Sequence, residues 1–114
     1  MPFINVKTNV KLTAQKKDII KRRLFDCIGV IPGKSDRYLM VAVEDNISMA
    51  FHRESNINIA MVEVKLFGGS TKDAYQRLTK AICMILSDEA NVPGENCYVK
   101  YEEVTYWGNN GFMF

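Results

Sequence analysis

The chain consists of two successive blocks in which a strand-like pattern is followed by a helical pattern and a second strand. Residues 3–8 alternate between apolar and polar side chains, as a strand with one buried face does. Thr13 is a suitable N-cap, and apolar residues at helical spacing predict a helix that runs to about Val30. Residues 38–44 are apolar enough to predict a central strand, and residues 48–51 predict a short extended piece paired at a sheet edge.

The same order of elements recurs in the second half of the chain. Residues 58–67 alternate as a strand and end at two glycines, after which Ser70 heads a capping box that predicts a helix to about Glu89. Residues 97–103 predict the last long strand, and residues 104–114 predict a hairpin-like tail with Gly and Asn in its turn. Each half is therefore expected to be a β-α-β unit.

This duplication predicts an α/β (α+β) fold in a single domain that covers residues 1–114. Crossovers that contain a helix imply right-handed parallel pairing within each half, and together the halves form one four-stranded mixed sheet with both helices on one face. The other face lacks a covering layer, although residues 40–43 place apolar side chains on both faces of their strand. We therefore expect that face to meet other subunits.

Composition and charge exclude several classes of protein. The chain is 47% hydrophobic and 25% charged, as folded domains are and disordered chains are not. Its 15 basic and 13 acidic residues give a net charge of +2, which is too balanced to make nucleic acid or an anionic membrane the main partner. The densest basic run, in residues 16–23, falls in a helical pattern and is interpreted as a solvated helix face.

The cysteines and the N-terminus indicate the compartment. Cys27, Cys83 and Cys97 are far apart and form no CxxC pair, so neither a disulfide framework nor a zinc site is predicted. Cys27 and Cys83 fall on apolar helix faces, where burial is expected. The chain shows no signal-peptide pattern and no apolar stretch of the roughly 20 residues that span a bilayer. A reduced, cytoplasmic location fits these features, with secretion without a signal peptide left open.

The usual catalytic motifs are absent from the sequence. His52 is the single histidine and is interpreted as a surface loop residue, and no grouping of residues predicts a metal site or a cofactor. Glu102 and Glu103 are adjacent on a strand, so they point to opposite faces and do not form a catalytic pair.

The N-terminal Met-Pro pair offers a different chemistry. Methionine aminopeptidase acts when the second residue is small, so the mature chain is expected to begin at Pro2. A chain-terminal amine is a weaker base than a lysine amine, and a water-poor pocket with a nearby cation lowers its pKa further. The neutral amine of Pro2 would then act as a general base near neutral pH.

Over essentially its full length, the sequence resembles the macrophage migration inhibitory factor family of the tautomerase superfamily. No single motif is specific, and the resemblance depends on the order and spacing of short segments within the duplicated β-α-β pattern. These segments are Pro2-Phe3-Ile4-Asn5-Val6, Gly33-Lys34, Tyr38-Leu39-Met40-Val41, Ser48-Met49-Ala50-Phe51, Val62-Glu63-Val64-Lys65 before Gly68-Gly69, Cys97-Tyr98-Val99 and Trp107-Gly108-Asn109-Asn110-Gly111-Phe112-Met113-Phe114.

The resemblance implies an active site shared between subunits. In the family the N-terminal proline transfers the proton, which matches Pro2, and a lysine after the first helix binds the substrate carboxylate, which matches Lys34. Phe67 would line the pocket through its backbone amide, and Tyr98 would reach it from the neighbouring subunit. Further residues expected as aromatic walls are Tyr38, Trp107 and Phe114.

The chain also departs from the family pattern. Lys100 stands where the family often has asparagine, two residues beyond Tyr98, and strand alternation puts both on one face, so a second cation is expected at the pocket rim. The segment after Phe67 is about three residues shorter than in close relatives. Ile59 and Val62 occupy the positions of a CxxC pair found in some members, so no thiol–disulfide activity is expected.

The resemblance implies a homotrimer with a central barrel-like channel and a cofactor-free isomerase of the phenylpyruvate/dopachrome tautomerase type. Its substrate would be a small aromatic 2-oxo acid. One alternative is a cytokine-like signalling protein that binds a cell-surface receptor and keeps a vestigial pocket. Another is hydration or decarboxylation of an unsaturated or halogenated acid, against which stands the lack of an arginine between Gly69 and Arg77.

Overall fold

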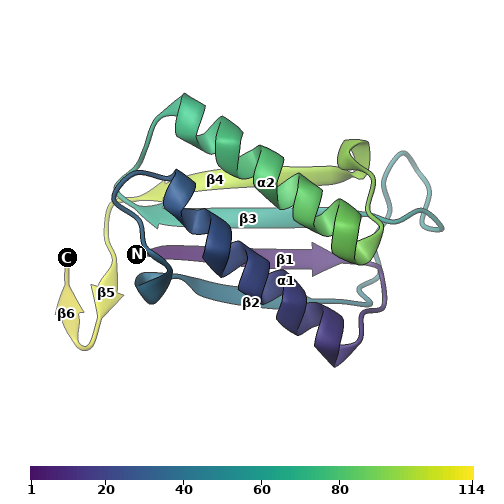
Figure 1. The fold of residues 1–114 in the computed structure, drawn as a ribbon, viewed down its shortest axis with the longest axis horizontal. Coiled ribbons are helices and arrows are strands. Elements are labelled where there is room, and N and C mark those ends of the chain that lie inside the picture. The colour runs from purple at the N-terminus through teal and green to yellow at the C-terminus, as the bar shows by residue number, and fades with distance from the viewer.

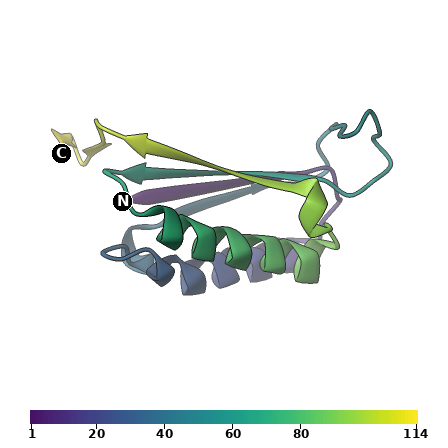
Figure 2. The same ribbon diagram turned by 90° about the horizontal axis from the view of Figure 1, so that it is seen from above.

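The computed structural model describes residues 1–114 and consists of a sheet with one layer of helices. The sheet contains β1 (Pro2–Thr8), β2 (Met40–Glu44), β3 (Ala60–Phe67) and β4 (Cys97–Val104) in the order β2-β1-β3-β4. The helices α1 (Ala14–Cys27) and α2 (Lys72–Ala90) lie side by side on one face (Figure 1). Figure 2 shows that no element covers the other face.

Strand pairing follows the duplication of the sequence. β1 pairs with β2 in parallel, β3 pairs with β4 in parallel, and the antiparallel pair of β1 and β3 joins the two halves at the centre of the sheet. The remaining elements are short, namely the 3₁₀ turns η1 (Ile28–Val30), η2 (Asp36–Tyr38) and η3 (Gly94–Asn96) and the tail hairpin of β5 (Gly108–Asn109) and β6 (Phe112–Met113). The predicted α+β fold with a mixed four-stranded sheet is confirmed.

The core lies between the sheet and the two helices. Alternate residues of β1 and β3 are fully buried, and they pack with the apolar stripes of both helices; the central side chains are Ile4, Val6, Val62, Val64, Ile20, Leu24, Leu78 and Ile82. Burying one such side chain contributes about 1.5–3 kcal/mol, so this layer provides most of the stability of the fold.

Threonine side chains cap the start of both helices. Thr13 Oγ1 accepts a hydrogen bond from the Lys16 N–H at 3.0 Å, as the sequence predicted. In α2 the cap is Thr71, which accepts from the Ala74 N–H at 3.1 Å, so the prediction of Ser70 as the cap was wrong by one residue. The reason is that α2 begins at Lys72, so the extended cap position before it falls on Thr71, while Ser70 still belongs to the turn after β3.

Two strand predictions need correction. β2 is an edge strand and not a central one, because β1 pairs with β3 on its other side and leaves the outer edge of β2 without a partner. The stretch 48–51 forms no strand, and only an isolated bridge joins Phe51 to Glu54. Only one edge of β2 is paired within the chain, so a central position in the sheet does not explain why this strand is so apolar.

The uncovered face is more charged than the sequence suggested. Lys100 forms ion pairs with Glu63 at 3.5 Å and with Glu102 at 2.9 Å, across and along the strands. Apolar side chains lie on the same face, among them Met40 of β2 at 68% exposed and Tyr98 of β4 at 59%. A subunit contact over this face would thus bury both charged and apolar side chains.

The basic run of α1 faces carboxylates from other elements. Lys16 and Arg23 both reach Glu89 at the end of α2, at 3.1 and 2.9 Å. Cys27 and Cys83 are half-buried, whereas Cys97 is buried. No helix combines the length and the apolar character that crossing a membrane requires.

Candidate active site

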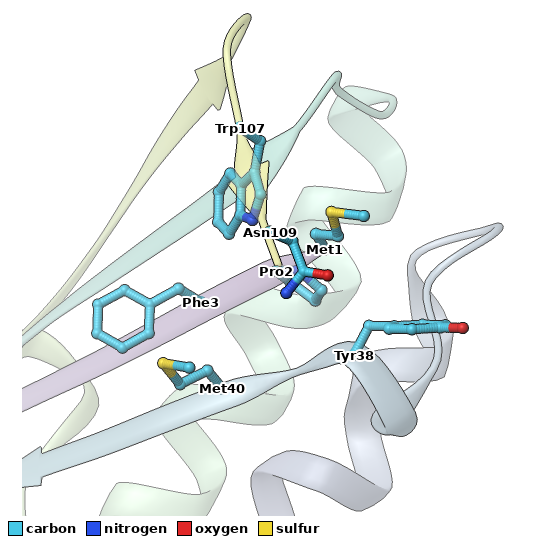
Figure 3. Close-up of a pocket in the computed structure, with 7 residues that line it drawn as sticks. All are labelled: Met1, Pro2, Phe3, Tyr38, Met40, Trp107 and Asn109. Atoms are coloured by element: carbon cyan, nitrogen blue, oxygen red, sulfur yellow. The ribbon is translucent and has the colours of Figure 1, made fainter. Parts of the chain in front are cut away.

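A cavity of about 290 Å³ opens at the end of the sheet where β1 begins. This volume is at the lower limit for a small-molecule pocket. Five of its seven lining residues are hydrophobic, and β1, β2 and the tail all contribute (Figure 3). The lining residues are Met1, Pro2, Phe3, Tyr38, Met40, Trp107 and Asn109.

The strand pairing places Pro2 at this cavity. Pro2 is the first residue of β1, a position at which a strand tolerates the missing N–H of proline. It is buried and pairs with Leu66 of β3. The N–H of Phe67 donates to the Met1 carbonyl oxygen at 3.1 Å, which ties the chain start to the end of β3. The backbone at Pro2 is therefore held in place on the floor of the cavity.

Lys34 is brought to the same end of the sheet by the turn after α1. Gly33 adopts a left-handed φ of 79°, and the Lys34 N–H bonds to the Ile31 carbonyl at 3.1 Å. The Lys34 Nζ donates to the Phe67 carbonyl oxygen at 2.9 Å, and Lys34 forms no ion pair with a carboxylate. Its positive charge thus remains available to an anionic ligand.

The charge of Lys34 acts on the chain start. Burial, and then the positive charge of Lys34, lower the pKa of the Met1 amine below its usual value. Both effects disfavour the ammonium form, which increases the fraction of neutral amine near neutral pH. An amine on Pro2 would occupy a more deeply buried position than one on Met1, since Pro2 is buried and Met1 only partly buried.

Aromatic residues of the tail and of η2 form the outer walls. The hairpin turn at Asn110 and Gly111 has left-handed φ at both residues, as a two-residue hairpin loop requires. The Phe114 N–H bonds to the Trp107 carbonyl at 2.9 Å, and the Phe114 ring lies 6.2 Å from that of Phe67. The tail therefore folds back over the end of β3, with Trp107 at the cavity.

Tyr98 lies far from Pro2 within one chain. Pro2 pairs with Leu66, which pairs with Glu103, and Tyr98 is five positions before Glu103 on β4. At roughly 3.3 Å per residue this separation is about 16 Å. Tyr98 is 59% exposed and touches Phe51 edge-on at 5.0 Å between ring centroids. It cannot contribute to the cavity of its own chain.

Lys100 shares a face with Tyr98, as alternation predicted, but it is not a free cation. Its ammonium is engaged by Glu102 and Glu63, which raise its pKa, with the hydrogen bond to Glu102 the larger cause. His52 is exposed in the turn that follows Phe51 and lies outside the cavity, in agreement with its interpretation as a surface residue.

Of the predicted site residues, the structure brings Pro2, Tyr38 and Trp107 to the cavity and places Lys34, Phe67 and Phe114 beside it. Phe3, Met40 and Asn109 also line the cavity and were not predicted from the sequence. Phe3 and Met40 are paired across β1 and β2, so the signal for them was strand register, which periodicity alone does not define.

Comparison with known proteins gives the family. The model of the family described as macrophage migration inhibitory factor (MIF) matches residues 1–114. The chain belongs to the macrophage migration inhibitory factor family. Its fold is that of the tautomerase superfamily, to which the family's solved homologues belong. No curated protein matches the chain.

Solved structures similar to this chain are close to it in fold and distant in sequence. MIF2 of Leishmania major has a TM-score of 0.92 at 25% identity and covers 100% of this chain and 97% of its own. The homologue from Prochlorococcus marinus has a TM-score of 0.88 at 23% identity, with 98% of each chain covered. Pt0534, solved in a form inactivated by 2-oxo-3-pentynoate, has a TM-score of 0.85 at 16% identity and covers 96% of this chain and 94% of its own.

Proposed function

We propose that the protein is a cofactor-free keto–enol tautomerase for phenylpyruvate-like 2-oxo acids, with Pro2 as its general base and acid after removal of Met1. The observation that carries the proposal is the cation placed at a buried chain start. Burial and Lys34 lower the pKa of the Met1 amine, one residue before Pro2, beside an apolar cavity of a size suited to one small ligand. Removal of Met1, which now lines that cavity, would enlarge it and expose the Pro2 nitrogen.

The reaction needs only the chain's own groups. The substrate carboxylate would bind the Lys34 ammonium, and its aromatic ring would lie against Trp107 and Tyr38. The neutral Pro2 nitrogen would remove a proton from the carbon next to the keto group, whose oxygen receives the electron pair. The resulting Pro2 ammonium would return the proton to that oxygen, giving the enol, and the reverse sequence would give the ketone.

We propose that the active assembly is a homotrimer in which Tyr98 of a neighbouring subunit completes each site. The distance of about 16 Å along the sheet from Tyr98 to the Pro2 level supports a contribution between chains. Both edge strands of the sheet are unpaired on one side, and such edges invite pairing with another chain. The tail exposes large apolar side chains, among them Tyr106 and Phe112 at 76% and 71%.

The inactivation of Pt0534 by 2-oxo-3-pentynoate, itself a 2-oxo acid, supports this substrate class. A decisive assay follows phenylpyruvate enol–keto conversion by absorbance, using protein whose Pro2 terminus is verified by mass spectrometry. We expect turnover that is strongly reduced in Pro2→Ala, which replaces the secondary amine by a primary one. Turnover should be lost in a matched protein that keeps one residue before Pro2, because an amide nitrogen is not a base. An inactive protein with an intact Pro2 amine would overturn the proposal and favour the signalling alternative.

A further inference from the structure

The segment of residues 67–70, which comprises the last residue of β3 and the turn after it, connects the cavity to a network on the helix side of the sheet. We call it the 67–70 loop. Gly68 adopts a left-handed φ of 78°, and its N–H donates to the Val104 carbonyl at 3.1 Å. Phe67, the first residue of the loop, accepts the Lys34 ammonium on its carbonyl oxygen and donates its N–H to the Met1 carbonyl. The position of Lys34 therefore depends on where this loop holds its first carbonyl.

Glu103 and Tyr75 hold the other end of the loop. The Ser70 N–H donates to Tyr75 Oη at 2.8 Å and to Glu103 Oε2 at 3.3 Å, and Tyr75 Oη donates to the same carboxylate oxygen at 2.5 Å. The carboxylate lies directly against Gly69, where an added Cβ would overlap it. A side chain at position 69 would thus displace either Glu103 or the loop.

These contacts join four separate elements. Tyr75 comes from α2, Glu103 from β4, Lys34 from the turn after α1, and the loop itself from the end of β3. The shorter bond from the loop goes to Tyr75 Oη, and the hydrogen bond of that hydroxyl to the charged Glu103 carboxylate, a strong type of hydrogen bond, fixes it in place. Burial, with a smaller contribution from Glu103, raises the pKa of Tyr75, which keeps its hydroxyl protonated as the donor.

We propose that Glu103 and Tyr75 are positioning residues for Lys34, acting through the 67–70 loop, and this inference rests on the proposed tautomerase function. Lysine has a flexible four-carbon stem, and a defined carbonyl partner is what confines its ammonium to one place. Neither residue touches the cavity, so each would act on substrate binding only through the Phe67 carbonyl. The 67–70 loop would then couple the hydrogen bonds on the helix side of the sheet to the position where Lys34 binds the substrate carboxylate.

The structure offers a matched control for Tyr75. The rings of Tyr75 and Tyr101 stack at 4.5 Å, and each hydroxyl takes part in two hydrogen bonds. The Tyr101 hydroxyl meets Thr79 Oγ1 at 2.7 Å and the Tyr75 carbonyl at 3.1 Å, and it makes no bond to the loop. Tyr75→Phe and Tyr101→Phe therefore remove similar groups from one ring pair, and only the first removes an anchor of the loop.

The experiment measures KM and kcat for phenylpyruvate in Tyr75→Phe, Glu103→Ala and Tyr101→Phe. We expect the first two variants to raise KM about fivefold or more with a smaller change in kcat, since misplacement of a binding group weakens substrate binding. Tyr101→Phe should leave both constants within about twofold of the wild type. Equal changes in KM for Tyr75→Phe and Tyr101→Phe would overturn the inference.

A double-mutant cycle separates positioning from general damage to the fold. In a Lys34→Ala background, Tyr75→Phe should have no further effect on kcat/KM, because the group that it positions is already absent. A second readout needs no catalysis: an ¹⁵N NMR titration of the Pro2 amine, whose pKa should rise in Tyr75→Phe and in Lys34→Ala but not in Tyr101→Phe. An unchanged titration in Tyr75→Phe refutes the positioning role, whereas absent turnover in the wild type refutes the proposed function.

Discussion

Removal of the Lys34 charge tests the centre of the proposed mechanism. Lys34→Met keeps most of the stem and deletes the ammonium that now donates to the Phe67 carbonyl at 2.9 Å. A hydrogen bond between charged partners contributes about 1.5–3 kcal/mol, which corresponds to an increase of roughly 10- to 150-fold in KM for an anionic substrate. The KM for a neutral 2-oxo ester of the same shape should increase much less.

The same substitution should also change the dependence on pH. Lys34 is the second cause, after burial, of the lowered pKa of the Met1 amine, and under the proposed function it would lower the pKa of a Pro2 amine in the same way. Removing it raises that pKa, so a larger fraction of the Pro2 amine is protonated at any pH near its midpoint. The acid limb of the kcat/KM profile should therefore move to higher pH, and the activity lost near neutral pH should partly return as the pH rises.

The assay compares Lys34→Met with Lys80→Met, which removes the same charge from an exposed position on α2 that forms no ion pair. Steady-state kinetics over a range of pH, on protein with a verified Pro2 terminus, give KM and the profile together. A KM for phenylpyruvate that stays within about twofold of the wild type, or an acid limb that moves to lower pH, would contradict the proposed role of Lys34.

Three further predictions concern assembly, capping and thiol chemistry. Mixed oligomers of Pro2→Gly and Tyr98→Ala chains should regain phenylpyruvate turnover that neither variant has alone, because some sites then combine an intact Pro2 with a neighbour's intact Tyr98; no recovery after mixing under dissociating conditions argues against a shared site. Thr71→Ala should lower the free energy of unfolding in urea by about 0.5–2 kcal/mol through loss of the α2 cap, and Ser70→Ala, as its control, should change it far less. Burial, followed by Cys83, raises the pKa of Cys97 to about 12, so its thiol is almost entirely protonated at pH 8. Mass spectrometry should therefore find Cys97 unmodified by iodoacetamide until urea unfolds the chain, and rapid alkylation of the folded protein would contradict this.

Local patterns in the sequence were sufficient for most of the secondary structure. The helical spacing of apolar residues predicted both helices, and the N-cap at Thr13 was found because a cap is a contact between near neighbours. The misplacement of the second cap at Ser70 arose where two hydroxyl residues, Ser70 and Thr71, stand next to each other. Only the backbone direction after Gly69 decides which of the two precedes the helix.

The site was predictable to the extent that its residues lie in motifs. Pro2 and Lys34 were assigned by resemblance, and the structure places both at one end of the sheet. There Lys34 bonds to the carbonyl of Phe67, which lies 33 positions further along the chain. The ion pairing of Lys100 could not be predicted from its position in the sequence, because its partner Glu63 lies on a different strand. The anchoring of the 67–70 loop by Tyr75 and Glu103 likewise leaves no pattern in the chain.

The sequence by itself therefore determined the elements, their duplication and the chemistry available at the chain start, because these depend on periodicity and residue type over short spans. Tertiary structure decided which elements became neighbours. It placed β2 at an edge, set Met40 beside Phe3, and moved Tyr98 to the far end of the sheet from Pro2. Strand order and register depend on contacts between residues far apart in the chain, and a local pattern carries no record of those contacts.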